Sequence, residues 1–168
     1  MPKRLLAAAE IRIRRARDAD LARLVEIENA IFVTDRMSRR QLRHHLVNPQ
    51  ADLLVATRAG EIAGAAVVFF HPRHRIARLY SIAVAAEARG TGVGAALLEA
   101  AERAAQRRGR ETFRLEVRTD NARARRLYER RGYHAIGTKA GYYEDGCDAV
   151  RYEKALRRSR GRVPPQQR

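Results

Sequence analysis

A glycine-rich turn at residues 89–94, Arg-Gly-Thr-Gly-Val-Gly, has residue types suited to holding a phosphorylated ligand. The apolar run Leu79–Val84 before it predicts a strand, and the apolar spacing after it predicts a helix. In such a turn, glycines let the backbone approach a ligand, and the first helical amides have no partner within the helix. The helix dipole adds positive potential there. The turn therefore predicts an anion site, with Arg89 placed to meet a diphosphate.

The spacing of the glycines distinguishes this turn from two common phosphate-binding motifs. A Walker loop needs Lys-Ser or Lys-Thr after its glycines, and neither follows here. Gly90, Gly92 and Gly94 are spaced GxGxG, so the dinucleotide fingerprint GxGxxG fails as well. The pattern R-x-x-G-x-G does fit, through Arg89, Gly92 and Gly94. It resembles the coenzyme A pyrophosphate loop of the GNAT superfamily of N-acetyltransferases.

A second candidate is Glu116, in the predicted strand Thr112–Val117. Apolar residues of this strand alternate onto one side, which leaves Arg114 and Glu116 on the other. A central strand is usually covered on both faces, so the carboxylate suggests an open cleft. The alternative is a partly solvated face on which Glu116 has a local arginine partner.

Hydrophobic periodicity predicts the elements that must position these residues. Strands are expected at 11–14, 52–57, 63–70, 77–84, 112–117, 135–142 and 148–156, and helices at 21–32, 38–48, 91–108 and 121–132. Ser38 is a plausible N-cap for the second helix, and Asn48-Pro49 should end it. This order predicts one α/β domain with a mixed sheet.

Downstream residues strengthen the resemblance. Leu115-Glu116-Val117-Arg118, Asn121, Leu127-Tyr128-Glu129 and Gly132-Tyr133 together resemble the second cofactor motif of GNAT enzymes. Their spacing is most similar to the ribosomal-protein alanine N-acetyltransferase (RimI-like) branch, over residues 11–156. The resemblance implies a mixed, mostly antiparallel central sheet of about seven strands flanked by about four helices.

The resemblance also implies a role for each matching position, with acetyl-CoA as the acetyl donor and no metal. Ile82, Ala83 and Val84 would offer backbone groups to the pantetheine arm and the acetyl carbonyl. The pyrophosphate would be held by Arg89, Gly90, Thr91, Gly92, Val93, Gly94 and Ala95. Asn121 would contact the pantetheine. Glu116 would be the general base, and Tyr128 the general acid beside the cofactor sulfur.

These roles make chemical sense, because an amine attacks a thioester only when it is neutral, so a base must accept its proton directly or through water. A backbone N–H can stabilise the oxyanion. The expected activity is direct acetyl transfer to a primary amine, most simply a protein N-terminus. The alternatives are a small-molecule amine or polyamine acetyltransferase and a non-catalytic acyl-CoA-binding or RNA-associated module.

Two features near the expected acceptor site remain. Tyr142-Tyr143 matches a tyrosine pair of the branch, whereas the last strand reads DAVRYEKAL in place of a more apolar ending. Arg151, Glu153 and Lys154 could face solvent by alternation, yet this strand borders the expected acceptor site. For Glu28, a carboxylate satisfied by a backbone or arginine partner is favoured over a catalytic role, and for Tyr128 the other interpretation is an ordinary core tyrosine.

Bulk properties bound the remaining choices. The net charge of +16 suggests contact with a polyanion such as a phosphorylated cofactor, RNA or the ribosome, or else an arginine-heavy background composition. The single cysteine, Cys147, suits a reducing compartment, and cytoplasm is the default. No apolar run is long enough to span a membrane, and no histidine or cysteine cluster predicts a metal site. The expected organisation is a flexible extension at 1–10, an acetyltransferase domain at 11–156 and a basic disordered tail at 157–168.

Overall fold

The computed structural model describes residues 9–157, which form seven strands, four α-helices and two short 3-10 helices. The elements are β1 (Ile11–Arg15), η1 (Asp18–Asp20), α1 (Leu21–Ile31), α2 (Arg39–Val47), β2 (Ala51–Arg58), β3 (Glu61–Phe70), β4 (Ile76–Val84), η2 (Ala86–Ala88), α3 (Val93–Arg107), β5 (Thr112–Arg118), α4 (Ala122–Arg130), β6 (His134–Lys139) and β7 (Ala149–Ala155). Strands and helices follow each other in the predicted order.

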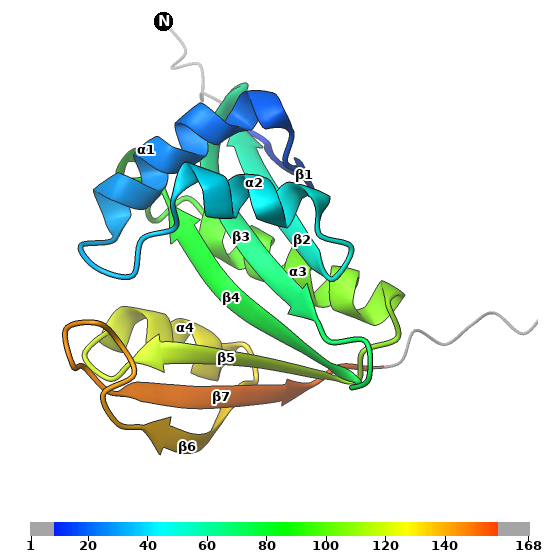
Figure 1. Cartoon of the computed structure of the whole chain (residues 1–168), viewed down its shortest axis with the longest axis vertical. Coiled ribbons are helices and arrows are strands. Elements are labelled where there is room, and N and C mark those ends of the chain that lie inside the picture. Colours follow the sequence, from blue (N-terminus) through cyan, green and yellow to red (C-terminus); the bar gives the residue numbers. More distant parts are fainter. Residues whose placement is uncertain (1–8, 158–168) are drawn as a thin grey trace, which may run out of the picture.

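All seven strands form one sheet, in the order β1-β2-β3-β4-β5-β7-β6. Every neighbouring pair is antiparallel except β4 and β5, which run parallel. These two strands pair only from Ile76 to Leu79 on β4 and from Thr112 to Leu115 on β5. Beyond those residues the strands diverge, and Figure 1 shows the opening between them. The mixed, mostly antiparallel sheet is confirmed.

The helices cover both faces of the sheet. On one face α1 and α2 pack on apolar residues of β2 and β3, including Leu53, Val55 and Val67. On the other face α3 and α4 join a larger core that contains Phe113, Leu115 and Val117. The alternation predicted for β5 is therefore present, and its polar side chains point toward the face on which α1 and α2 lie. The short α1 and α2 lie over β2, β3 and the upper part of β4, as Figure 1 shows.

Short polar signals fix the ends of the helices. Ser38 caps α2 as predicted: its hydroxyl accepts from the Gln41 amide, and the Gln41 side chain accepts from the Ser38 amide. Asn121 caps α4 in the same way by accepting from the Ala124 amide. The predicted strand at 135–142 was too long, because β6 ends at Lys139 and a loop through residue 148 follows.

Parts of the predicted terminal segments lie outside the described residues, namely positions 1–8 of the extension and positions 158–168 of the tail. Arg157 is described, and its carbonyl accepts from Gln106 Nε2 at 3.0 Å. Within residues 9–157, every helix is too short or too polar to cross a membrane.

Candidate active site

The opening between β4 and β5 exposes one edge of β4. On its other edge β4 pairs with β3, and the Ala85 amide continues that pairing by donating to the Ala63 carbonyl at 2.8 Å. Because bonding alternates along an antiparallel pair, the groups of Ala83 also face β3, and those of Ile82 and Val84 face the opening. Of the three predicted strand residues, Ile82 and Val84 therefore direct their N–H and C=O groups toward the side of β4 that β5 leaves unpaired. The backbone groups of Ala83 are used within the sheet.

The predicted phosphate turn lies at the end of this edge, where η2 leads into α3. Gly92 is the N-cap of α3 and has a φ of 91°, in the left-handed region that favours glycine. The first bond of the helix runs from the Ala96 amide to the Gly92 carbonyl, at 3.0 Å. The amides of Val93, Gly94 and Ala95 precede it and have no acceptor among residues 9–157. These free donors at a helix N-terminus suit an anion.

Side chains around the turn divide into those that build it and those left free. The Thr91 hydroxyl donates to the Ala88 carbonyl at 2.5 Å, which closes the turn. Arg23 on α1 anchors it from outside through an ion pair with Glu87 at 2.5 Å. Arg89 is exposed and has no ion-pair partner in the described part of the chain. Arg89 is therefore the cation of this turn that remains available to a ligand.

Glu116 lies one residue beyond the end of the β4–β5 pairing. Its side chain is only 5% exposed, because two arginines cover it. Its Oε2 accepts from Arg78 Nε at 2.9 Å, and its Oε1 accepts from Arg151 Nη2 at 3.2 Å and Nε at 3.3 Å. Of the two alternatives for this face, the local arginine partner is present. β7 pairs with β5, which places Arg151 directly across from Glu116, and the Arg151 side chain is still 31% exposed on that side of the strand.

The tyrosine pair of the β6–β7 loop adjoins these arginines. Arg78 Nη2 donates to the Tyr142 hydroxyl, and the Tyr142 and Tyr143 rings meet edge to face with centroids 5.0 Å apart. Burial, together with the nearby Tyr142 and Glu116, raises the pKa of Tyr143 to about 12. The Arg118 guanidinium lies 5.0 Å from the centroid of the Tyr143 ring. Aromatic and cationic groups therefore surround the approach to Glu116.

Tyr128 lies on the opposite side of the sheet, on α4. Its ring packs edge to face against Tyr133, with centroids 5.6 Å apart, and the side chain is almost fully buried. Burial raises the pKa of Tyr128, so the hydroxyl stays protonated at neutral pH. No group among residues 9–157 is hydrogen-bonded to this hydroxyl. The ring of Tyr128 thus packs in the core, while its hydroxyl has no hydrogen-bond partner in residues 9–157 and can donate a hydrogen bond.

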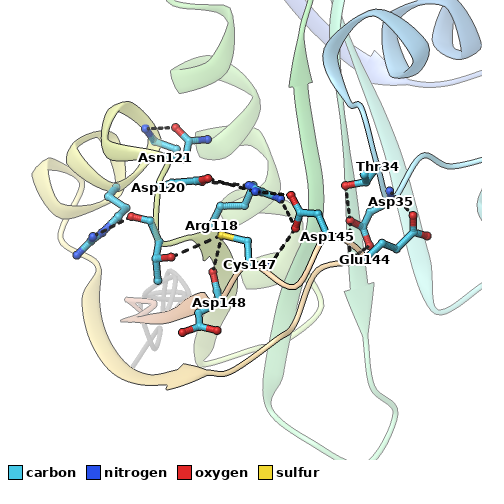
Figure 2. Close-up of polar contacts among 12 residues, drawn as sticks. Thr34, Asp35, Arg118, Asp120, Asn121, Glu144, Asp145, Cys147 and Asp148 are labelled. Atoms are coloured by element: carbon cyan, nitrogen blue, oxygen red, sulfur yellow. Dashed lines mark hydrogen bonds and ion pairs between the residues drawn. The ribbon is translucent and has the colours of Figure 1, made fainter.

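Two loops are tied together beside the site, as Figure 2 shows. Asp35, between α1 and α2, accepts from the Glu144 amide at 3.3 Å, and the Glu144 carboxylate accepts from the Asp35 amide at the same distance. Arg118 binds Asp120 and Asp145, which connects the end of β5 to the β6–β7 loop. The hydrogen bonds to Arg118 lower the pKa of both carboxyl groups. These contacts hold both loops next to the tyrosine pair.

Sequence reasoning missed Arg78, Arg151 and the Asp35–Glu144 contact. The signal for Arg151 was present in the alternation of β7, since residues opposite Glu116 on a neighbouring strand face the same side. Using it required knowing that β7 pairs with β5. No group of three or more histidine, cysteine, aspartate or glutamate side chains in residues 9–157 is arranged to hold a metal ion.

Comparison with known proteins identifies the family. The model of the acetyltransferase (GNAT) domain matches residues 3–156, so the chain belongs to the GNAT acetyltransferases, which use acetyl-CoA as donor. A Bacillus subtilis (strain 168) protein, whose name proposes it as a ribosomal protein bS18-alanine N-acetyltransferase, is 31% identical over 82% of this chain and 91% of its own. An N-alpha-acetyltransferase of Sulfurisphaera tokodaii is 30% identical over 83% of this chain and 90% of its own. The structure of the ribosomal-protein-S18-alanine N-acetyltransferase from Escherichia coli superposes with a TM-score of 0.79, at 26% identity, over 92% of this chain and 99% of that chain.

Proposed function

We propose that this acetyltransferase transfers an acetyl group from acetyl-CoA directly to the N-terminal amine of a protein. The observation that carries the proposal is the divergence of β4 and β5 beyond Leu79 and Leu115, with the free amides of the phosphate turn after β4 and Glu116 just past the last paired residue of β5. Two relatives that align along most of the chain support this acceptor class, one named as a ribosomal protein bS18-alanine N-acetyltransferase and the other as an N-alpha-acetyltransferase.

The residues of the opening fit the donor. The amides of Val93, Gly94 and Ala95, with Arg89 beside them, would hold the pyrophosphate. The outward-facing groups of Ile82 and Val84 would pair with the amides of the pantetheine arm. Asn121 would contact the same arm with its amide nitrogen, because its oxygen already caps α4. Bound in this way, acetyl-CoA supplies a thioester carbonyl near the point where the strands diverge.

Acetyl transfer then needs two proton movements. As the acceptor nitrogen bonds to the acetyl carbon and the carbon–sulfur bond breaks, Glu116 would take a proton from the amine, directly or through water. The buried Tyr128 hydroxyl would donate to the leaving sulfur. A backbone N–H of β4 facing the opening would stabilise the charge that develops on the acetyl oxygen.

The position of Glu116 sets one condition on this mechanism. Both of its oxygens accept hydrogen bonds from guanidinium groups, so an amine or water that reaches Glu116 would have to bind beside Arg78 and Arg151 or displace one of them. The base is functional only when at least one of these arginines moves or shares its oxygen.

The test is acetylation of a peptide panel with labelled acetyl-CoA, comparing wild type with Tyr128→Phe and Glu116→Gln. Removing a general acid or base typically lowers the rate by about 10²–10⁴. Tyr128→Phe keeps the packed ring and deletes only the hydroxyl, so we expect a fall in kcat of that order with little change in coenzyme A affinity. Glu116→Gln should also lower kcat.

Two results would contradict the proposal. Near-wild-type turnover in Tyr128→Phe would reduce that residue to packing. Transfer to small amines or polyamines, with no peptide accepted, would replace the protein N-terminus by a small-molecule acceptor.

The net charge of +16 favours an acceptor on an RNA-rich particle such as the ribosome, and hence a cytoplasmic site of action.

A further inference from the structure

Two arginines share a single carboxylate at the floor of the open face. Arg78 uses Nε on Glu116 and Nη2 on Tyr142, and Arg151 uses Nε and Nη2 on Glu116. The Nη1 group of each arginine has no acceptor among residues 9–157. Two guanidinium charges therefore face one carboxylate, with donors left over on both.

The neighbouring charged groups on the same face are bound to other partners within residues 9–157. Arg114 is paired with Glu153 one step along β5 and β7, and Arg118 is held by Asp120 and Asp145. Asp35 and Glu144 are each bound to the other's backbone amide in the two loops, and within residues 9–157 neither forms a hydrogen bond or ion pair with Arg78 or Arg151. Lys139, 5.3 Å from the centroid of the Tyr142 ring, adds another positive charge nearby.

Exposure shows which group an incoming acceptor meets first. The side chains of Arg78 and Arg151 are 38% and 31% exposed, whereas Glu116 beneath them is 5% exposed. An acceptor that approaches over the open face therefore reaches the guanidinium groups before it reaches the base.

We propose that Arg78 and Arg151 bind a carboxylate carried by the first residue of the acceptor, so that the enzyme prefers an acidic acceptor. This inference rests on the proposed function and narrows its acceptor. The carboxylate could be the side chain of an N-terminal Asp or Glu in a peptide, or the α-carboxylate of a free amino acid. Both present the same chemistry to a guanidinium, which pairs readily with carboxylates.

Such a carboxylate would also release Glu116, the proposed base, from one of the two arginines that cover it. By accepting hydrogen bonds from one arginine it would replace a Glu116 oxygen as that arginine's partner. The number of arginine–carboxylate contacts would stay the same, and the freed Glu116 oxygen could take the proton of the amine. A neutral acceptor offers no such exchange, because uncovering Glu116 would leave a guanidinium without its partner.

The experiment measures kcat/KM for peptides that differ only in the first residue, comparing Glu with Gln and Asp with Asn. A charge-assisted hydrogen bond is worth enough for the acidic peptide to be favoured about tenfold or more. In Arg151→Gln and in Arg78→Gln this ratio should fall toward one, and Arg151→Lys should retain part of it. The ratio is taken within each variant, so it does not depend on how much of that variant is folded.

Arg114→Gln is the matched control, since it removes a paired arginine of the same face that contacts Glu153 and not Glu116. It should leave the Glu/Gln ratio as in wild type. Two acceptors distinguish the sources of the carboxylate. A C-terminally amidated Glu peptide offers the side-chain carboxylate of its first residue, whereas free glutamate also offers an α-carboxylate. Equal kcat/KM for Glu and Gln peptides in wild type, or a preference for Lys, would overturn the inference while acetylation itself persists. Acetylation of none of these acceptors would instead overturn the proposed function.

Discussion

Two buried glutamates on this fold are stabilised in different ways. Glu116 accepts from two guanidinium groups, whereas Glu28 on α1 accepts from the Met37 amide at 2.8 Å and has no cationic partner among residues 9–157. Glu28 is 4% exposed, and its single hydrogen bond ties α1 to the start of the segment that leads into α2. This agrees with the prediction of a carboxylate satisfied by the backbone, and it makes Glu28 a structural group whose charge is poorly compensated.

The pKa of Glu28 provides a prediction about stability. Burial raises this pKa, and the Met37 hydrogen bond opposes the shift only in part. The folded state therefore binds the proton more tightly than the unfolded state, whose pKa is about 4.3. The resulting stabilisation is complete below that value and is lost as the pH rises through the folded pKa. Glu28→Gln keeps an acceptor for Met37, so the variant should be more stable than wild type at neutral pH.

Urea unfolding at several pH values measures this difference. The advantage of Glu28→Gln should shrink as the pH falls through the folded pKa of Glu28 and should be smallest below the unfolded pKa. Glu26→Gln is the control, because Glu26 is 66% exposed on the same helix and should change little. A Glu28→Gln variant that is less stable than wild type at pH 7 would mean that the charged form is the one that the fold favours.

At the scale of elements, we expect the start of α3 to bind the phosphates of the donor. Gly92→Asp would place a negative charge where we expect the diphosphate, and one lost charge-assisted contact corresponds to about a tenfold or greater loss of coenzyme A affinity. Gly92→Asn is the matched control, since Asn and Asp both tolerate the left-handed conformation but only Asp adds charge. Calorimetry should show a much larger loss for Asp than for Asn. Equal affinities in both variants and wild type would remove the turn from the donor site.

The elements were predictable from sequence to the extent that local patterns define them. The alternation of β5, the Ser38 cap and the glycine turn before α3 each depend on residues close in the chain, and each is present. The cluster of Arg78, Glu116 and Arg151 depends instead on which strands become neighbours. β7 lies between β5 and β6, so the residue facing Glu116 comes from 35 positions away. Periodicity predicts the side of a strand and not the strand beside it.

At the scale of the whole molecule, the last buried residue of the described domain, Leu156, directly follows β7. The Leu156 amide donates to the Glu111 carbonyl at 2.8 Å, and Leu156 is 7% exposed within the core shared with α3. We therefore expect a chain ending at Arg157 to fold and to acetylate small peptides as the full chain does. A chain ending at Ala155 should lose stability, because it lacks a buried leucine and a backbone bond. Thermal unfolding and peptide turnover of both shortened chains test this boundary. Inactivity of the chain that ends at Arg157 would show that residues 158–168 belong to the functional unit.

The short parallel junction has a consequence for the order of substrate binding. Only four residue pairs join β4 to β5, so the two halves of the sheet are connected over a short stretch at one end. The donor contacts that we propose lie mainly on the β4 half, and most of the arginines and tyrosines that we propose for the acceptor lie on the β5–β7 half. If the pantetheine arm of the donor binds along the free edge of β4, it would fill the space between β4 and β5. The bound arm would then fix the distance between the two halves of the sheet. The acceptor would then find its groups aligned only after the donor has entered, which corresponds to a sequential kinetic mechanism in which acetyl-CoA binds first.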